Sequence, residues 1–151
     1  MSKYFSFTAE GFLKVKKEKD DLLIKRKTAV ENLRTAREMG DLSENAAYKV
    51  ARGELSSIDS RIRHLNKLIL FGRVETVPTN GEIGIGSKIT LMHGERKLEY
   101  EIVGSFESNP SNGKISSVSP LGKALIGEKE GKSVTIFTPN GQTNYQIIDV
   151  K

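Results

Sequence analysis

Apolar residues recur at alternating steps of three and four through the segment from residue 48 to residue 69. The recurring positions are Tyr48, Ala51, Leu55, Ile58, Ile62, Leu65 and Ile69. A heptad repeat of this kind is typical of a helix that packs along one seam against a second helix. The pattern therefore predicts a long helix with a helical partner.

The preceding segment repeats the same spacing less regularly and supplies that partner. Its positions are Phe12, Val15, Lys19, Leu22, Arg26, Ala29, Leu33 and Ala36. Lys19 and Arg26 break the apolar rule, although the long stems of such side chains can still cover a seam. Thr8 suits the N-cap of this first helix, and Gly40 suits the position just past its C-terminus.

The link between the two segments is short and neither contains proline, so the two helices are expected to run antiparallel. Helices of about 28 to 30 residues, rising about 1.5 Å per residue, would form a hairpin roughly 45 Å long. The stretch "GDLSEN", residues 40–45, would be the tip of this hairpin.

After residue 75 the chain changes to short β-branched runs separated by Gly and Pro. The runs "SKITLMHGERKLEYEIVG", "GKISSV" and "KSVTIFTPNGQTNYQIIDV" are typical of strands, with turns at "HGER" and "PNGQ". Between them, "SPLGKALIG" has Ser119 as an N-cap, Pro120 at the first helical position and Gly127 as a stop. The predicted fold class is α+β, with a coiled-coil hairpin arm at residues 1–75 and a compact domain at residues 76–151.

Net charge separates the same two parts of the chain. Residues 1–75 contain 16 Lys or Arg against 11 Asp or Glu, whereas residues 76–151 contain 8 of each. The whole net charge of +5 therefore lies in the first part. Such asymmetry favours a polyanionic partner for the arm, although mixed charge on a long exposed helix can also serve only to keep it in solution.

Composition excludes several kinds of site. The chain has no cysteine, which removes disulfides, thiol catalysis and cysteine-rich zinc sites, and its two histidines are too few and too scattered for a metal cage. No apolar run approaches the roughly 20 residues needed to cross a membrane. The start "MSKYFSFTAEGF" lacks the apolar core of a signal peptide. We therefore expect a cytoplasmic protein with no membrane partner.

Two carboxylates, Asp41 and Glu44, lie at the predicted tip in the stretch "MGDLSENAAY". The D-x-x-E spacing before a helical pattern is typical of a capping box, in which Asp41 accepts from the helix and Glu44 reaches back. An ionised carboxylate has about four lone-pair sites, and a cap uses only one or two of them. Both residues could therefore cap the helix and still bind a cation.

The stretch "AREMGDLSENAAYKVAR", residues 36–52, resembles the tip of bacterial transcript cleavage factors of the GreA/GreB family. "SPLGKALIG" and "TPNGQTNYQIIDV" resemble the C-terminal domain of that family, and the former is more GreA-like. The resemblance implies an antiparallel coiled-coil hairpin joined to an FKBP-like α+β domain. It implies that this domain docks at the rim of the RNA polymerase secondary channel while the hairpin enters the channel. We expect a monomer.

The resemblance also implies that the protein is not an enzyme but activates the intrinsic endonuclease of bacterial RNA polymerase. Backtracked transcripts would be cleaved, short 3′ RNA released and elongation restarted. Asp41 and Glu44 would hold Mg²⁺ shared with the polymerase active site, and the factor alone would bind no cofactor stably. Magnesium prefers hard oxygen ligands, and two-metal phosphodiester cleavage needs a second ion about 4 Å from the first.

Further residues take roles by the same resemblance. Leu42 and Asn45 would pack and position the tip. Arg37 and Arg52 would hold the 3′ end of the nascent RNA through its phosphates, unless they form only a solvated helix face. The polymerase-docking candidates are Ser119, Pro120 and Leu121. These last three residues could instead serve only to begin a helix.

Two other functions stay open. A polymerase channel regulator of the same fold would bind without promoting cleavage, but the presence of Asp41 and Glu44 favours cleavage, and the lack of cysteine argues against zinc-bearing regulators. A nucleic-acid-binding coiled coil would instead bind free RNA or DNA in a salt-sensitive way. An FKBP-like domain also suggests prolyl isomerisation, but a stacked aromatic pocket is not apparent among the few aromatic residues after residue 75. These are Tyr100, Phe106, Phe137 and Tyr145.

Overall fold

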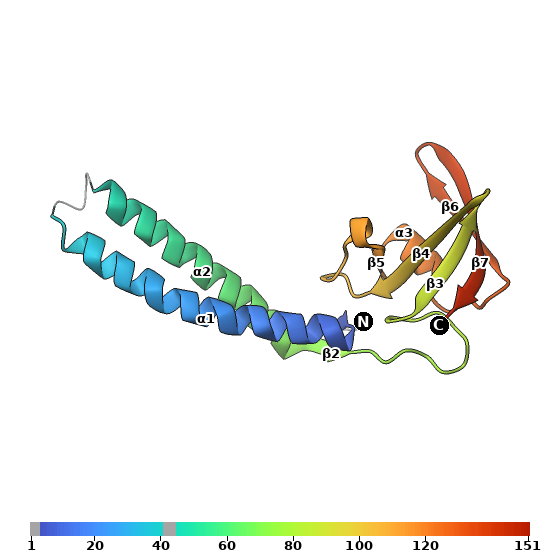
Figure 1. Cartoon of the computed structure of the whole chain (residues 1–151), viewed down its shortest axis with the longest axis horizontal. Helices are drawn as coiled ribbons and strands as arrows, with labels where there is room; N and C mark the ends of the chain where they lie inside the picture. Colours follow the sequence, from blue (N-terminus) through green and yellow to red (C-terminus); the bar gives the residue numbers. More distant parts are fainter. Residues whose placement is uncertain (1–3, 41–44) are drawn as a thin grey trace. The chain divides into compact units, whose positions relative to one another are not determined.

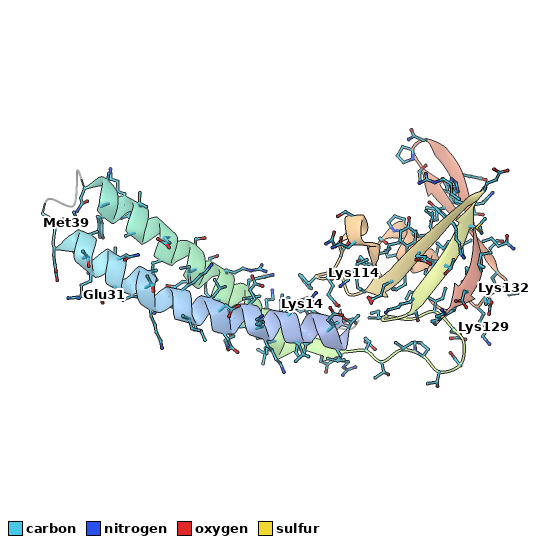
Figure 2. The ribbon with its side chains drawn as sticks, viewed as in Figure 1. Lys14, Glu31, Met39, Lys114, Lys129 and Lys132 are labelled. Atoms are coloured by element: carbon cyan, nitrogen blue, oxygen red, sulfur yellow. The ribbon has the colours of Figure 1, made fainter. Side chains whose placement is uncertain are left out.

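The computed structural model of the chain describes residues 4–40 and 45–151. Two long helices, α1 (Ala9–Arg37) and α2 (Ala46–Phe71), form a hairpin, and a strand-rich part follows in the sequence (Figure 1). Side chains project from both helices along their length (Figure 2). The α+β architecture predicted from the heptads and the β-branched runs is confirmed.

The predicted seam of α2 is the buried face of that helix. Ala51, Ile58 and Leu65 are buried, and the other four predicted seam positions are half-buried. In α1 the small side chains of Ala29 and Ala36 are buried. Removing such apolar surface from water at about 25 cal/mol per Å² is the main stabilising contribution to the hairpin.

Ion pairs join the two helices where the α1 seam is polar. Arg26 Nε donates to Asp59 Oδ1 at 2.5 Å, and Arg61 Nε donates to Glu18 Oε1 at 2.8 Å. Because the later residue in α1 pairs with the earlier residue in α2, the helices run antiparallel. The hydrogen bond from Arg26 also holds the pKa of the Asp59 carboxyl below its ordinary value. Lys19 is half-buried, as expected of a side chain whose stem covers the seam.

The strand-rich part contains a five-stranded sheet in the order β5-β4-β3-β7-β6. The strands are β3 (Lys88–His93), β4 (Arg96–Val103), β5 (Lys114–Ser116), β6 (Ser133–Thr138) and β7 (Gly141–Val150). Neighbouring strands are antiparallel except β4 and β5, which are parallel and are connected through the short 3-10 helix η1 (Pro110–Asn112). The predicted turns at "HGER" and "PNGQ" join β3 to β4 and β6 to β7.

The short helix α3 (Pro120–Leu125) packs on β5 and β6. The buried core of this part consists of Ile83, Ile89, Leu91, Ile102, Ile115, Leu125, Val134 and Ile147. Ser119 Oγ caps α3 by accepting a hydrogen bond from Gly122 N at 3.1 Å, and Gly127 follows the helix with a φ of 85°. Both ends of α3 therefore lie where the sequence predicted them.

A two-stranded parallel sheet escaped the sequence analysis. It pairs β1 (Phe5–Phe7) with β2 (Gly72–Val74), so that it joins the segment before α1 to the segment after α2. By contacts, residues 1–12 and 72–151 form one compact unit, the globular unit, and residues 13–71 form the other, the arm. The folding boundary predicted after residue 75 stays a prediction, because contacts describe packing and not independent folding.

Candidate functional site at the hairpin tip

Helix α1 ends just before the stretch that carries the predicted carboxylates, and helix α2 begins just after it. Helix α1 ends at Arg37, Gly40 follows in the left-handed region with a φ of 117°, and α2 begins at Ala46. Asp41, Leu42 and Glu44 lie outside the described residues. Their predicted roles in metal binding and tip packing therefore stay predictions, and the site is built from the residues on either side.

Asn45 joins the two helices through both ends of its side-chain amide. Its Nδ2 donates to the carbonyl oxygen of Ala36 in α1 at 2.7 Å, and its Oδ1 accepts from Tyr48 N in α2 at 3.0 Å. Its carbonyl accepts from Lys49 N at 3.2 Å, which is the first main-chain bond of α2. Asn45 is therefore the N-cap of α2 and also holds the last turn of α1.

This geometry corrects the capping-box interpretation of the tip. With Asp41 as the N-cap, α2 would have to begin at residue 42, whereas it begins four residues later at Ala46. The N-cap is Asn45, and the amide that it satisfies belongs to Tyr48. Asp41 is therefore not the N-cap of α2, and the placement of Asp41 and Glu44 themselves lies outside the described residues.

Two predicted nucleic-acid contacts meet at one aromatic ring. The guanidinium carbon of Arg37 lies 5.8 Å from the centroid of the Tyr48 ring, and that of Arg52 lies 5.7 Å from it. Both distances fall within the range of cation–π attraction. Arg37 comes from the last turn of α1 and Arg52 from α2, so the ring gathers positive charge from both helices. The sequence analysis treated Tyr48 only as packing, although its i, i+4 spacing to Arg52 was visible.

The docking candidates at the start of α3 differ in how much their side chains are already engaged. Ser119 Oγ accepts from Gly122 N and also donates to the carbonyl of Ser116 at 2.7 Å. Leu121 is half-buried and packs against the core, whereas Pro120 is exposed. Pro120 is therefore the member of this set whose side chain is most available to a partner.

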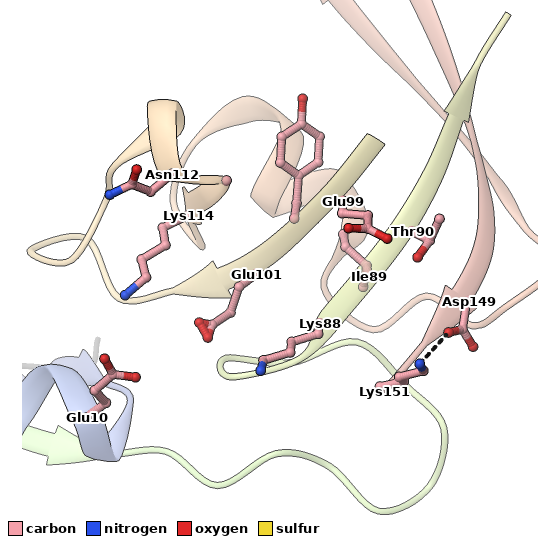
Figure 3. A pocket seen from close by; sticks show the side chains of 12 residues that line it. Glu10, Lys88, Ile89, Thr90, Glu99, Glu101, Asn112, Lys114, Asp149 and Lys151 are labelled. Atoms are coloured by element: carbon pink, nitrogen blue, oxygen red, sulfur yellow. Dashed lines mark ion pairs between the residues drawn. The ribbon is translucent and has the colours of Figure 1, made fainter. Parts of the chain in front are cut away.

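The globular unit also has a charged concave surface of about 580 Å³ over β3 and β4 (Figure 3). Lys88 lies opposite Glu101 in the strand register, and Lys151 is 3.8 Å from Asp149. Lysines and carboxylates thus alternate across this face of the sheet and offset one another. None of the predicted site residues lines this surface.

Comparison with known proteins decides the family. Residues 5–71 match the family described as "Transcription elongation factor, N-terminal", and residues 78–151 match the one described as "Transcription elongation factor, GreA/GreB, C-term". This chain belongs to the GreA/GreB family of transcription elongation factors. The recognition of this family from the tip sequence is thereby confirmed.

Relatives in this family match the chain over nearly its whole length. Transcription elongation factor GreA of Listeria welshimeri is 40% identical over 151 residues, which cover 96% of this chain and 94% of that protein. GreA of Staphylococcus saprophyticus is 38% identical over 154 residues, which cover 99% and 98%. The crystal structure of GreA factor homolog 1 of Thermus thermophilus is 23% identical, covers 99% of both chains and gives a TM-score of 0.47.

Residues 4–40 and 45–151 contain no group of three or more His, Asp or Glu side chains placed to hold a metal ion. None of the helices in that part of the chain has the length and hydropathy that crossing a membrane requires.

Proposed function

We propose that this GreA/GreB family member inserts its hairpin tip into the secondary channel of bacterial RNA polymerase and stimulates cleavage of backtracked transcripts. Cleavage releases short 3′ RNA and lets elongation restart in the cytoplasm. The factor is not an enzyme, because the endonuclease activity belongs to the polymerase active site. It acts as a monomer through its globular unit, which docks, and its arm, which carries the tip.

The observation that carries this proposal is the N-cap of α2. Asn45 supplies the cap with a neutral amide, so Asp41 and Glu44 are not needed for it. Two carboxylates three positions apart, with no capping task at α2, keep their charge and lone pairs for a hard cation. A stiff two-helix arm of about 40 Å can carry them into a narrow channel.

The tip carboxylates supply oxygen ligands at the polymerase active site. Asp41 and Glu44 would hold Mg²⁺ together with polymerase groups, and the ion would supply activation of the water that attacks the phosphodiester. The factor alone keeps no ion, because two carboxylates leave most of the coordination sphere to water. This donor set is the reason that the tip is acidic within an arm that is basic as a whole.

The paired arginines act on the RNA that the reaction consumes. Arg37 and Arg52 lie at the same tyrosine ring, where their guanidinium groups can contact phosphates of the extruded 3′ end. Such contacts position a substrate without reading its sequence. They would hold the scissile phosphate near the tip, as cleavage at a defined distance from the 3′ end requires.

The test measures cleavage of RNA in an elongation complex that has been stalled and allowed to backtrack. The RNA carries a label at its 3′ end. Adding the protein with magnesium should release short labelled RNA and restore elongation when nucleotides are supplied. Polymerase binding without release of labelled RNA would contradict the proposal and favour a channel regulator without cleavage activity. Salt-sensitive binding to free RNA or DNA, with no effect on the complex, would favour a nucleic-acid-binding coiled coil.

A further inference from the structure

The N-cap residue of α1, Thr8, is held by a side chain that lies 99 residues away in the sequence. Glu107 Oε2 accepts from Thr8 N at 2.8 Å and from Gly104 N at 3.1 Å. Glu107 Oε1 accepts from the hydroxyl of Thr8. The same hydroxyl accepts from Gly11 N at 3.0 Å, which is the N-cap bond that the sequence predicted.

Two glycines allow this close approach. A Cβ on Gly11 would lie 1.9 Å from Glu107 Oε1, and a Cβ on Gly104 would lie 1.8 Å from the carbonyl oxygen of Ser6. Both distances are far inside van der Waals contact, so neither position can hold a larger residue without movement of the backbone or of Glu107. The helix turn and the loop after β4 are therefore shaped for each other.

Aromatic side chains next to Thr8 and Glu107 in the sequence pack on one another. The Phe106 ring meets Phe5 edge-on with centroids 5.1 Å apart, and it stacks on Phe7 at 6.1 Å. Phe7 is fully buried and also contacts Phe12, with centroids 5.3 Å apart. Aromatic pairs of this geometry stabilise a contact beyond simple burial. All of these residues belong to the globular unit, together with the first turn of α1.

We propose that Glu107 is a positioning residue for the tip, because it fixes the first turn of α1 within the globular unit. This inference rests on the proposed function, in which the globular unit docks and the arm delivers the carboxylates. Helix α1 is continuous from the globular unit into the arm. A rigid first turn therefore gives the arm a defined base.

The length of the helix makes the tip sensitive to its base. Helix α1 continues for about 38 Å beyond residue 12, so a tilt of about 5° at the base moves its far end by about 3 Å. A displacement of about 1 Å at a reacting centre can already cost about 100-fold in rate. Loosening the base therefore lowers cleavage even when the tip residues are intact and the globular unit still docks.

Substitutions at Glu107 separate the hydrogen bonds from the charge. Glu107→Ala removes all three acceptor contacts. Glu107→Gln keeps one oxygen for the two backbone amides and turns its NH₂ toward Thr8 Oγ1, which has a lone pair left beside the one used by Gly11. The glutamine variant should therefore behave like the unmodified protein. Glu130→Ala is the matched control, since Glu130 is an exposed carboxylate of the same unit.

The direct readout is the spread of distances between the arm and the globular unit. The chain has no cysteine, so spin labels can be attached at Lys49→Cys in α2 and Lys132→Cys before β6, both exposed positions. We expect pulsed electron paramagnetic resonance to give a broader distance distribution for Glu107→Ala, and an unchanged one for Glu107→Gln and Glu130→Ala. Circular dichroism of each variant checks that the globular unit is folded.

The functional readout is cleavage measured at saturating protein. Glu107→Ala should lower the cleavage rate at least about tenfold and change the affinity for the backtracked complex by less than about threefold. A purely structural role would instead lower both through loss of folded protein. An unchanged distance distribution or normal cleavage for Glu107→Ala would overturn the proposal.

Two further outcomes keep the test decisive. If Glu107→Ala does not fold, Thr8→Ala is measured in the same way. It removes one of the three hydrogen bonds to Glu107, together with the N-cap bond from Gly11, and leaves the carboxylate in place. If the unmodified protein releases no short RNA, the proposed function fails. The distance measurement then still decides whether Glu107 fixes the base of the helix.

Discussion

Replacing Asn45 tests whether its amide holds the hairpin tip together. Asn45→Ala removes the N-cap bond from Tyr48 N and the bond to the carbonyl of Ala36. Loss of an N-cap costs about 1 kcal/mol, and loss of the second bond costs about 1 kcal/mol more. The two losses together should lower the local stability of the tip by about 2 kcal/mol, which is a factor of about 30 in the opening equilibrium.

Asn45→Asp separates the two contributions. An aspartate is as good an N-cap as asparagine, so the bond from Tyr48 survives. The carboxylate cannot donate to the Ala36 carbonyl, so only the bond between the helices is lost. We expect a loss of about 1 kcal/mol, half that of the alanine variant.

Hydrogen exchange at the amides of Tyr48 and Lys49, followed by NMR, measures this local opening directly. Both amides should exchange about 30-fold faster in Asn45→Ala and about fivefold faster in Asn45→Asp. Amides in the middle of α2, such as that of Ile62, serve as an internal control and should not change. Equal exchange in all three proteins would refute the role of Asn45. Exchange in Asn45→Asp that is as fast as in Asn45→Ala would refute the division between its two bonds.

Four further predictions concern other residues of the arm and the globular unit. Tyr48→Leu should weaken cross-linking of the RNA 3′ end to the protein in the complex, because it removes the ring that holds both arginines, at about 0.5–1 kcal/mol for each cation–π contact. Tyr48→Phe keeps the ring and should leave cross-linking unchanged. Equal loss in both variants would refute the role of the ring. The Asp59 carboxylate, whose pKa is lowered by its arginine partner, stabilises the arm above its unfolded pKa of about 4, and this contribution disappears as pH falls through the lower folded value. Thermal melts of Asp59→Asn should therefore depend less on pH below about 4 than those of the unmodified protein, and equal dependence would argue against the pair. Asp41→Asn with Glu44→Gln should change arm stability by less than about 0.5 kcal/mol and lower cleavage by orders of magnitude while polymerase binding persists. Normal cleavage by that double variant would leave the chain as a binding factor. Pro120→Ala should weaken competition for polymerase with the melting curve unchanged, and unchanged competition would remove Pro120 from the docking surface.

The helices and the sheet were predictable because their signals are local and repeated. Every predicted seam position of α2 is at least half-buried, and the turn and cap residues around α3 lie where predicted. The pair β1–β2 was not predictable, because three residues show no periodicity and Phe5 pairs with Gly72 across 67 residues of chain. Glu107 was missed for the same reason, since nothing near it in the sequence indicates a helix that begins at Ala9.

The error at the tip has a more specific cause. The D-x-x-E spacing indicated Asp41 as the N-cap, and Asn45 was assigned only to positioning the tip. Helix α2 begins at Ala46, and Asn45 is the residue that caps it and bonds across the hairpin to the Ala36 carbonyl. The local spacing of side chains does not show this tertiary contact.

The residue type at position 45 also explains why acidic residues and a structural cap can share so short a tip. The position accepts from one helix and donates to the other, and the neutral amide of Asn45 does both through two separate atoms, Oδ1 and Nδ2. A carboxylate there could make only the accepting bond, and it would add a third negative charge beside Asp41 and Glu44. The neutral cap therefore leaves the charge at the tip to the two residues proposed to bind the metal ion, and the positive charge of Arg37 and Arg52 stays available for RNA.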